Sequence, residues 1–120
     1  MTFTASVLYD GDLCVLALAG DLDVAVTALV DASVRELLRD GLRTVVVDLT
    51  ALTFCDSTGL SALLSVSRTV REAGGRAAFA GAAGAVRRLF DLMAVDGLLE
   101  TAPDVGVLLR EVERVPRVGT

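Results

Sequence analysis

The sequence contains no histidine, no lysine and no tryptophan, and aromatic residues make up only 4% of its 120 positions. Without histidine there is no Ser-His or Cys-His nucleophile pair and no imidazole metal ligand. Without lysine there is no Walker-type phosphate loop. No two remaining groups form a recognisable acid-base or nucleophile-base pair. We therefore expect no enzymatic activity, no catalytic residue, no metal and no cofactor.

Basic residues are also scarce. The 16 acidic side chains outnumber 11 basic ones, all of them arginine, and the formal net charge is −5. Such a molecule repels a phosphate backbone or an anionic membrane surface. The amino terminus lacks the basic and apolar regions of a signal peptide, and no uncharged apolar run approaches the roughly 18 residues that cross a bilayer. We expect a cytoplasmic protein with neither a nucleic-acid nor a membrane partner.

Cysteine occurs only twice, at Cys14 and Cys55, without C-x-x-C spacing. In a reducing compartment this pattern favours buried small hydrophobic residues over a disulfide or metal ligands. The hydrophobic fraction is 53%, mostly alanine, valine and leucine, which suits one tightly packed core. We expect a single domain over residues 1–115 and a flexible tail over 116–120.

The apolar pattern predicts strands at the start of the chain, then helices alternating with strands. Two strand-like segments flank an Asp-Gly turn, which predicts an antiparallel hairpin. Further along, apolar residues recur every three or four positions, which predicts helices. The expected strands cover 3–8, 13–19, 44–49, 76–80 and 98–101. The expected helices run from Asp23, as N-cap, to Gly41, from Ser57 to Gly74, and over about 83–93 and 104–115, the last ended by Pro116.

This order, β-β-α-β-α-β-α-β-α, defines an α/β fold class. Helices that follow inner strands imply a mostly parallel sheet with right-handed crossovers, preceded by the antiparallel hairpin and covered by the helices. The nearly continuous apolar run 44–49 predicts a central strand. Residues 50–56 are expected to form a connection.

One turn concentrates short polar side chains where the second predicted helix begins, namely Asp56, Ser57 and Thr58, followed by Gly59. A helix start leaves several backbone N–H groups free, and one side chain that caps them contributes about 1 kcal/mol. A cap needs one side chain rather than three, and Gly59 costs the helix roughly 0.8–1 kcal/mol relative to alanine. Glycine there keeps the turn low and lets another surface approach closely. On local chemistry alone, a turn in which Ser57 or Asp56 is only an N-cap and a turn in which Ser57 accepts a phosphate are equally good interpretations.

A second acidic cluster, Asp21 and Asp23, follows the second predicted strand. The simplest interpretation is a helix cap and a solvated acid. The pair is also similar to the D-x-D opening of haloacid-dehalogenase phosphatases. However, Ala25 replaces the expected Thr or Val, and no lysine is available to hold the phosphate.

Two weaker candidates lie elsewhere. Asp48 could correspond to the phosphate acceptor of a response-regulator receiver, but the lysine and the acidic pair that receivers need are missing. The Gly-Ala-Ala-Gly segment at 81–84, before the third predicted helix, fits a plain turn better than an anion site.

Several motifs in order resemble the STAS domain family, and more narrowly the bacterial anti-sigma factor antagonists. The Asp-Ser-(Ser/Thr)-Gly-Leu segment after an inner strand is the most specific of them. The resemblance covers roughly residues 3–115. Its motifs are Gly20-Asp21-Leu22-Asp23, Val46-Val47-Asp48-Leu49, Phe54-Cys55-Asp56-Ser57-Thr58-Gly59-Leu60, Gly74-Gly75 and Val86-Arg87-Arg88-Leu89-Phe90.

The resemblance implies a binding protein that performs no catalysis itself. In the family, an anti-sigma factor with serine kinase activity binds ATP and phosphorylates the hydroxyl residue that corresponds to Ser57. The unphosphorylated antagonist binds the anti-sigma factor and releases the sigma factor, and a metal-dependent serine phosphatase restores it. By position, the partner-binding residues would be Asp21, Asp23, Asp56, Ser57, Thr58 and Gly59. We expect a monomer or a weak dimer.

The sequence departs from the family pattern at two positions. Thr58 replaces the commoner serine and leaves a second candidate hydroxyl. Ala94 stands where glycine is frequent, which leaves the shape of that loop open. An alternative function also remains, namely a structural STAS module of a signalling complex or a transporter-associated assembly, in which Ser57 is only a cap. The sequence names neither the sigma factor nor the signal.

Overall fold

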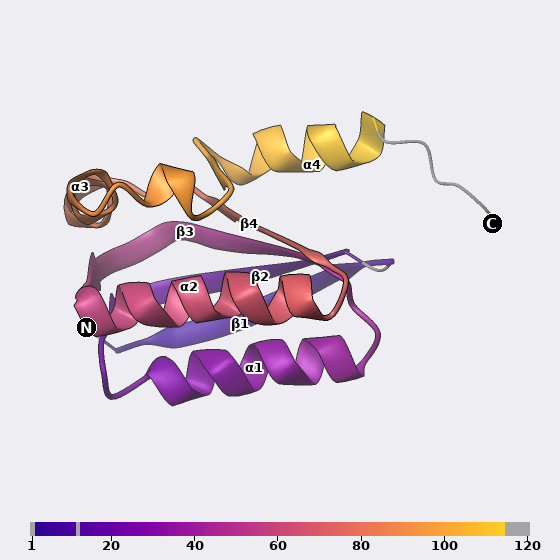
Figure 1. Cartoon of the computed structure of the whole chain (residues 1–120), viewed down its shortest axis with the longest axis horizontal. Coiled ribbons are helices and arrows are strands. Elements are labelled where there is room, and N and C mark those ends of the chain that lie inside the picture. Colours follow the sequence, from indigo (N-terminus) through magenta and orange to yellow (C-terminus); the bar gives the residue numbers. More distant parts are fainter. Residues whose placement is uncertain (1, 12, 115–120) are drawn as a thin grey trace.

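The computed structural model in Figure 1 describes residues 2–11 and 13–114, with side chains as far as 111. The order of its elements matches the predicted β-β-α-β-α-β-α-β-α order. The strands are β1 (Thr4–Asp10), β2 (Leu13–Leu22), β3 (Thr44–Cys55), β4 (Arg76–Ala80) and β5 (Thr101–Ala102). The helices are α1 (Thr27–Arg39), α2 (Ser57–Glu72), α3 (Gly84–Leu92) and α4 (Val105–Arg114), with a 3₁₀ turn η1 (Val95–Gly97).

The five strands form one mixed sheet in the order β1-β2-β3-β4-β5. β1 and β2 form the predicted antiparallel hairpin, and all other neighbours are parallel. β3 is central, as the apolar run predicts, and Val45, Val46 and Val47 at its start are all buried. Both faces are therefore covered where the run is continuously apolar.

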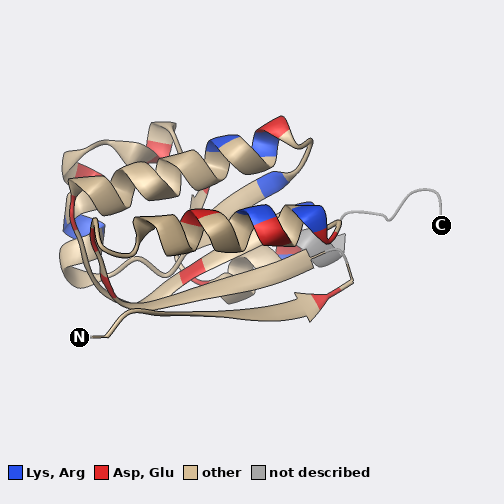
Figure 2. Cartoon of the chain, turned by 90° about the horizontal axis from the view of Figure 1, so that it is seen from below, with Lys and Arg blue, Asp and Glu red and all other residues tan. Residues whose placement is uncertain are grey.

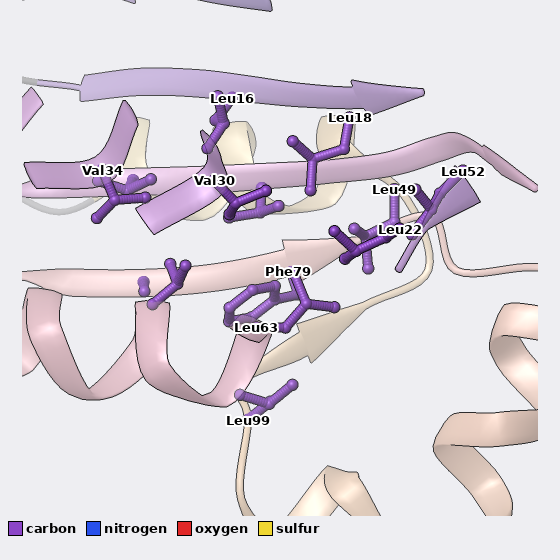
Figure 3. Close-up of a cluster of buried hydrophobic side chains, with 14 of the residues drawn as sticks. Leu16, Leu18, Leu22, Val30, Val34, Leu49, Leu52, Leu63, Phe79 and Leu99 are labelled. Atoms are coloured by element: carbon purple, nitrogen blue, oxygen red, sulfur yellow. The ribbon is translucent and has the colours of Figure 1, made fainter. Parts of the chain in front are cut away.

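Two helical layers cover the sheet. Figure 1 shows α1 and α2 side by side on one face and α4 on the other. The larger core lies under α1 and α2, where strand and helix side chains interdigitate (Figure 3). It includes Leu16, Leu18, Val30, Val34, Leu63 and Phe79. A smaller core under α4 contains Leu13, Val46, Ala78, Ala80 and Leu108.

Both cysteines are buried, as predicted. Cys14 and Cys55 carry free thiols within the larger core. Burial raises the pKa of Cys14 to about 11. Burial, and secondarily the charge of Asp56, raises the pKa of Cys55 to about 12. The two side chains therefore pack as neutral, small hydrophobic groups.

The first helix begins later than predicted. Asp23 was expected as its N-cap, and this is wrong, because α1 starts at Thr27. The Asp23 carboxylate instead accepts the N–H of Ala25 at 3.0 Å, and the Asp23 carbonyl accepts the N–H of Val26 at 3.1 Å. An aspartate that bonds two residues ahead forms its own turn and delays the helix.

The central strand is longer than predicted. Residues 50–55 were expected in a connection, but β3 continues to Cys55 because β2 continues beside it to Leu22. Two register shifts interrupt this part of the ladder. They break the two-residue alternation that reveals a strand in a sequence. β3 pairs with β4 only as far as Asp48, and α3 contacts the part of β3 beyond it (Figure 1).

The last third of the chain differs in detail. The expected strand 98–101 is instead β5 at Thr101–Ala102, and η1 ends at Gly97, so residues 98–100 form neither helix nor strand. Leu29 and Met93 follow the apolar spacing of their helices but are 52% and 53% exposed. The predicted helix stop at Pro116 and the predicted tail at 116–120 lie outside the described residues.

Candidate functional site

The candidate turn lies between the end of β3 and the start of α2. Asp56 is the N-cap of α2, with an extended backbone at φ −95° and ψ −174°. Its Oδ1 accepts the N–H of Gly59 at 2.8 Å and the hydroxyl of Thr58 at 2.6 Å. Of the two residues considered as caps, Asp56 rather than Ser57 fills that role.

The two hydroxyl groups of the turn have different surroundings. Ser57, the first residue of α2, is exposed, and its hydroxyl makes no hydrogen bond to any residue in the described part of the chain. Thr58 is also exposed, but its hydroxyl is held by the Asp56 carboxylate. Ser57 therefore presents an unengaged hydroxyl at the helix start.

Gly59 is buried beneath this turn. A Cβ there would lie 2.4 Å from the carbonyl oxygen of Leu22 and 2.9 Å from the Sγ of Cys55. The same carbonyl accepts the N–H of Asp56 at 3.4 Å. The surface that the glycine allows to approach is therefore the chain's own strand β2, which lies directly against the start of α2.

This contact brings the second acidic cluster beside the turn. Leu22 pairs with Cys55 in the β2-β3 ladder and lies next to the turn. Asp21 and Asp23 are the chain neighbours of Leu22 on either side. The Asp21 carboxylate accepts the hydroxyl of Thr53 at 3.1 Å, and Asp23 closes the turn before α1. Both aspartates are partly buried. The structure thus gathers Asp21, Asp23 and the 56–59 turn at one end of the sheet.

The turn carries negative charge. The hydroxyl of Thr58, and after it the N–H of Gly59, hold the pKa of Asp56 below its ordinary value, so this carboxylate is ionised at neutral pH. Residues 20–34 and 50–67 contain four aspartates and no arginine. In Figure 2 the blue segments of α1 and α2 lie toward the ends of these two helices that are farther from the turn. This end of the helix pair is therefore acidic.

A groove that the sequence analysis missed begins at the turn and runs between α1 and α2. It has a volume of about 430 Å³. Val24, at 71% exposure, lies on its wall. The signal that could have revealed it is the run of small residues on the facing sides of two adjacent helices. The lining residues are Val24, Thr27, Ala28, Asp31, Thr58, Ser61, Ala62 and Ser65.

The glycine turn at 81–84 has a simple local explanation. Gly81 and Gly84 adopt φ values of +85° and +55°, which favour glycine in a turn. Arg87, in the first turn of α3, is paired with Asp91 and Asp96 at 2.8 and 3.0 Å.

Over residues 2–11 and 13–114, no three Cys, Asp or Glu side chains gather to hold a metal ion. In the same part of the chain, no helix combines the length and apolar character needed to cross a membrane.

Comparison with known proteins identifies the family. The model of the STAS domain matches residues 5–108, and the chain belongs to this family. The α/β architecture is that of a STAS domain.

Solved structures share the fold at low sequence identity. An anti-sigma factor antagonist from Mycobacterium paratuberculosis is 21% identical, with a TM-score of 0.82 over 93% of this chain and 95% of that one. The anti-sigma factor antagonist SpoIIAA in its unphosphorylated form is 18% identical, with a TM-score of 0.72 over 95% and 100%. SpoIIAA from Bacillus in its phosphorylated form is 20% identical, with a TM-score of 0.67 over 92% and 99%.

The same fold also occurs in a protein of a different kind. A sulfate transporter family protein from Wolinella succinogenes is 10% identical, with a TM-score of 0.74 over 88% of both chains. The fold alone therefore does not separate a regulator from a transporter-associated domain.

Proposed function

We propose that this chain is an anti-sigma factor antagonist whose binding to an anti-sigma factor is switched off by phosphorylation of Ser57. The observation that carries the proposal is the exposed, unengaged Ser57 hydroxyl at the start of α2. Membership of the STAS family supports it, as do related folds among anti-sigma factor antagonists, one of them solved in a phosphorylated form. In this proposal the chain is a binding protein and not an enzyme.

The fold tolerates a phosphate at this position. Ser57 lies at the positive end of the α2 dipole, which favours an exposed anion by about 0.3–1 kcal/mol. The group adds about 1.5 to 2 negative charges next to the ionised Asp56. These two effects oppose each other and both are modest at an exposed site, so phosphorylation leaves the domain folded.

Binding responds more strongly than folding. Like charges that are pressed together across an interface cost several kcal/mol, and about 4 kcal/mol corresponds to a thousandfold loss of affinity. A phosphate on Ser57 adds bulk at the point of contact, and a docked partner would press its charges against the ionised Asp56 carboxylate. The turn is therefore suited to an on/off switch of binding.

We infer that the contact surface includes Asp21, Asp23, Asp56 and Thr58, with the α1/α2 groove as its continuation. Gly59 is buried and contributes by allowing β2 to support the turn from inside. The partner is an anti-sigma factor with serine kinase activity that supplies its own bound ATP. A serine phosphatase removes the phosphate, and the cycle takes place in the cytoplasm.

A second candidate is a structural STAS module without regulated phosphorylation. The fold shared with a sulfate transporter family protein favours it. Gel filtration and pull-down separate the two candidates. A large homo-assembly or a membrane-transport partner, with no kinase recovered, supports the second candidate, whereas a complex with a kinase-type anti-sigma factor supports the first.

Phosphate mapping tests the proposed function. The purified chain is incubated with ATP and the kinase-type anti-sigma factor of the same organism, and the product is analysed by peptide mass spectrometry. We expect one phosphate, on Ser57. Absence of label on both Ser57 and Thr58 rules the proposal out.

A further inference from the structure

The two neighbouring hydroxyls at the start of α2 are not equivalent, and the difference lies in one carboxylate. Asp56 Oδ1 accepts the Thr58 hydroxyl at 2.6 Å and the Gly59 N–H at 2.8 Å. No described residue holds the hydroxyl of Ser57. Exposure does not distinguish the two residues, because both side chains are exposed.

We propose that Asp56 is a specificity-determining positioning residue, which restricts phosphoryl transfer to Ser57 by holding the Thr58 hydroxyl out of reaction. The inference rests on the proposed function and adds to it the reason why one of two adjacent acceptors is used.

The phosphoryl transfer sets the requirement. The acceptor Oγ forms a bond to the γ-phosphorus of ATP while the bond from that phosphorus to the bridging oxygen breaks, and ADP leaves. The hydroxyl proton passes to a base of the kinase, so the O–H must be free to turn toward that base. Ser57 meets this requirement. The Thr58 O–H already donates to a carboxylate, in the short geometry of a charge-assisted bond.

The carboxylate adds an electrostatic barrier at Thr58. A phosphoryl group arriving on Thr58 Oγ1 would meet an ionised oxygen only 2.6 Å from that atom. The Gly59 N–H holds this oxygen in place, and the Leu22 carbonyl accepts the Asp56 N–H. Neither the hydrogen bond nor the fixed charge can move away without loss of the helix cap.

Four chains separate this inference from the proposed function: the unchanged protein, Ser57→Ala, Ser57→Ala with Asp56→Ala, and Ser57→Ala with Asp56→Asn. Each is incubated with the kinase-type anti-sigma factor and ATP, and label on Thr58 is quantified by mass spectrometry. We expect Thr58 label in Ser57→Ala to stay below a tenth of the Ser57 label in the unchanged protein. The Asp56→Ala double variant should carry at least tenfold more label on Thr58 than Ser57→Ala.

The asparagine variant is the matched control. Its amide oxygen still accepts from Thr58 and Gly59 but carries no charge, so we expect Thr58 label well below that of the Asp56→Ala double variant. If the asparagine double variant carried as much Thr58 label as the Asp56→Ala double variant, the hydrogen-bond restraint would be overturned. Strong Thr58 label in Ser57→Ala, or none in an Asp56→Ala double variant that still binds the kinase, would also overturn the inference. In each of these cases Ser57 label in the unchanged protein leaves the proposed function standing.

A measurement without kinase tests independently whether Asp56 restrains the Thr58 side chain. NMR three-bond couplings report the χ1 angle of Thr58 in solution. We expect one rotamer in the unchanged protein and in Asp56→Asn, and averaging among rotamers in Asp56→Ala. Averaging already present in the unchanged protein would contradict the restraint, whatever the kinase does.

Discussion

The backbone carbonyl of Leu22 and the α-carbon of Gly59 are in direct contact, so that a Cβ on Gly59 would lie 2.4 Å from that oxygen. The contact joins the end of β2 to the first turn of α2. It sets the height of the turn that carries Ser57 and brings Asp21 and Asp23 beside it. Because the obstacle is backbone, it cannot rotate away as a side chain can.

The change Gly59→Ala should therefore destabilise the domain by about 1–3 kcal/mol, as overpacking does in a filled core. This loss should occur even though alanine is the better helix former by about 1 kcal/mol. Urea denaturation followed by circular dichroism measures the change. Gly106→Ala in α4 is the matched control, because its added Cβ would meet only movable side-chain atoms of Asp104 and Arg110 at 3.0 and 3.3 Å. A Gly59→Ala variant as stable as the unchanged protein would contradict the close contact.

The stability of the turn should depend on pH through Asp56. Its folded-state pKa is lowered, first by the Thr58 hydroxyl and then by the Gly59 N–H. A lowered pKa means that the stabilisation is complete above the unfolded value of about 3.9 and is lost as pH falls through the folded value. We expect the Gly59 amide resonance in NMR to titrate at a pH below about 3.9, and Asp56→Asn to remove this transition. Titration at or above the unfolded value would argue against the cap geometry.

Most of the fold follows from the sequence, because its signals are local. The apolar run at 44–49, the Asp-Gly hairpin and the helix start at Ser57 each reflect short-range periodicity or turn chemistry. The strand extension over 50–55 was missed because it depends on β2 continuing beside it through two register shifts. Pairing between distant segments leaves little trace in a local pattern.

The site was partly predictable for the same reason. The polar turn at 56–59 is contiguous, so its residues stand out from the amino-acid sequence alone. The identity of the capping side chain does not stand out in this way, because Asp56, Ser57 and Thr58 are all capable acceptors. Nor does the partner of Gly59, since Leu22 lies 37 residues away in the chain (59 − 22). The groove between α1 and α2 also depends on how two helices pack.

The loop after α3 contains a strained residue. Ala94 adopts φ 52° and ψ 42°, the left-handed conformation that favours glycine. The alanine at this position therefore holds a backbone conformation that glycine adopts without a Cβ clash. Ala94→Gly should stabilise the domain by about 0.5–1 kcal/mol, because relief of the Cβ clash, about 1–2 kcal/mol, exceeds the added entropy of glycine. Differential scanning calorimetry should show a raised Tm, and an unchanged or lowered Tm would contradict the assigned conformation.

The groove offers a test of the contact surface by charge and bulk. Ala62→Arg fills the groove next to the turn and adds positive charge to an acidic region. We expect at least a tenfold loss of affinity for the kinase-type anti-sigma factor, measured by calorimetry.

Ala73→Arg is the control for this change. Ala73, the C-cap of α2, lines a groove of about 460 Å³ at the other end of the helix pair, together with Arg35 and Arg39. The affinity of this variant should stay within twofold of the unchanged protein. Equal losses from both variants would place the contact surface elsewhere.

The switch at Ser57 is tested by calorimetric titration of the kinase-type anti-sigma factor with four chains: the unmodified chain, the Ser57-phosphorylated chain, Ser57→Ala and Ser57→Asp. We expect Ser57→Ala to bind like the unmodified chain, because the Ser57 hydroxyl makes no bond that the fold needs. We expect Ser57→Asp to bind at least tenfold more weakly and the phosphorylated chain to bind more weakly still. Equal affinities for all four would contradict a switch at Ser57.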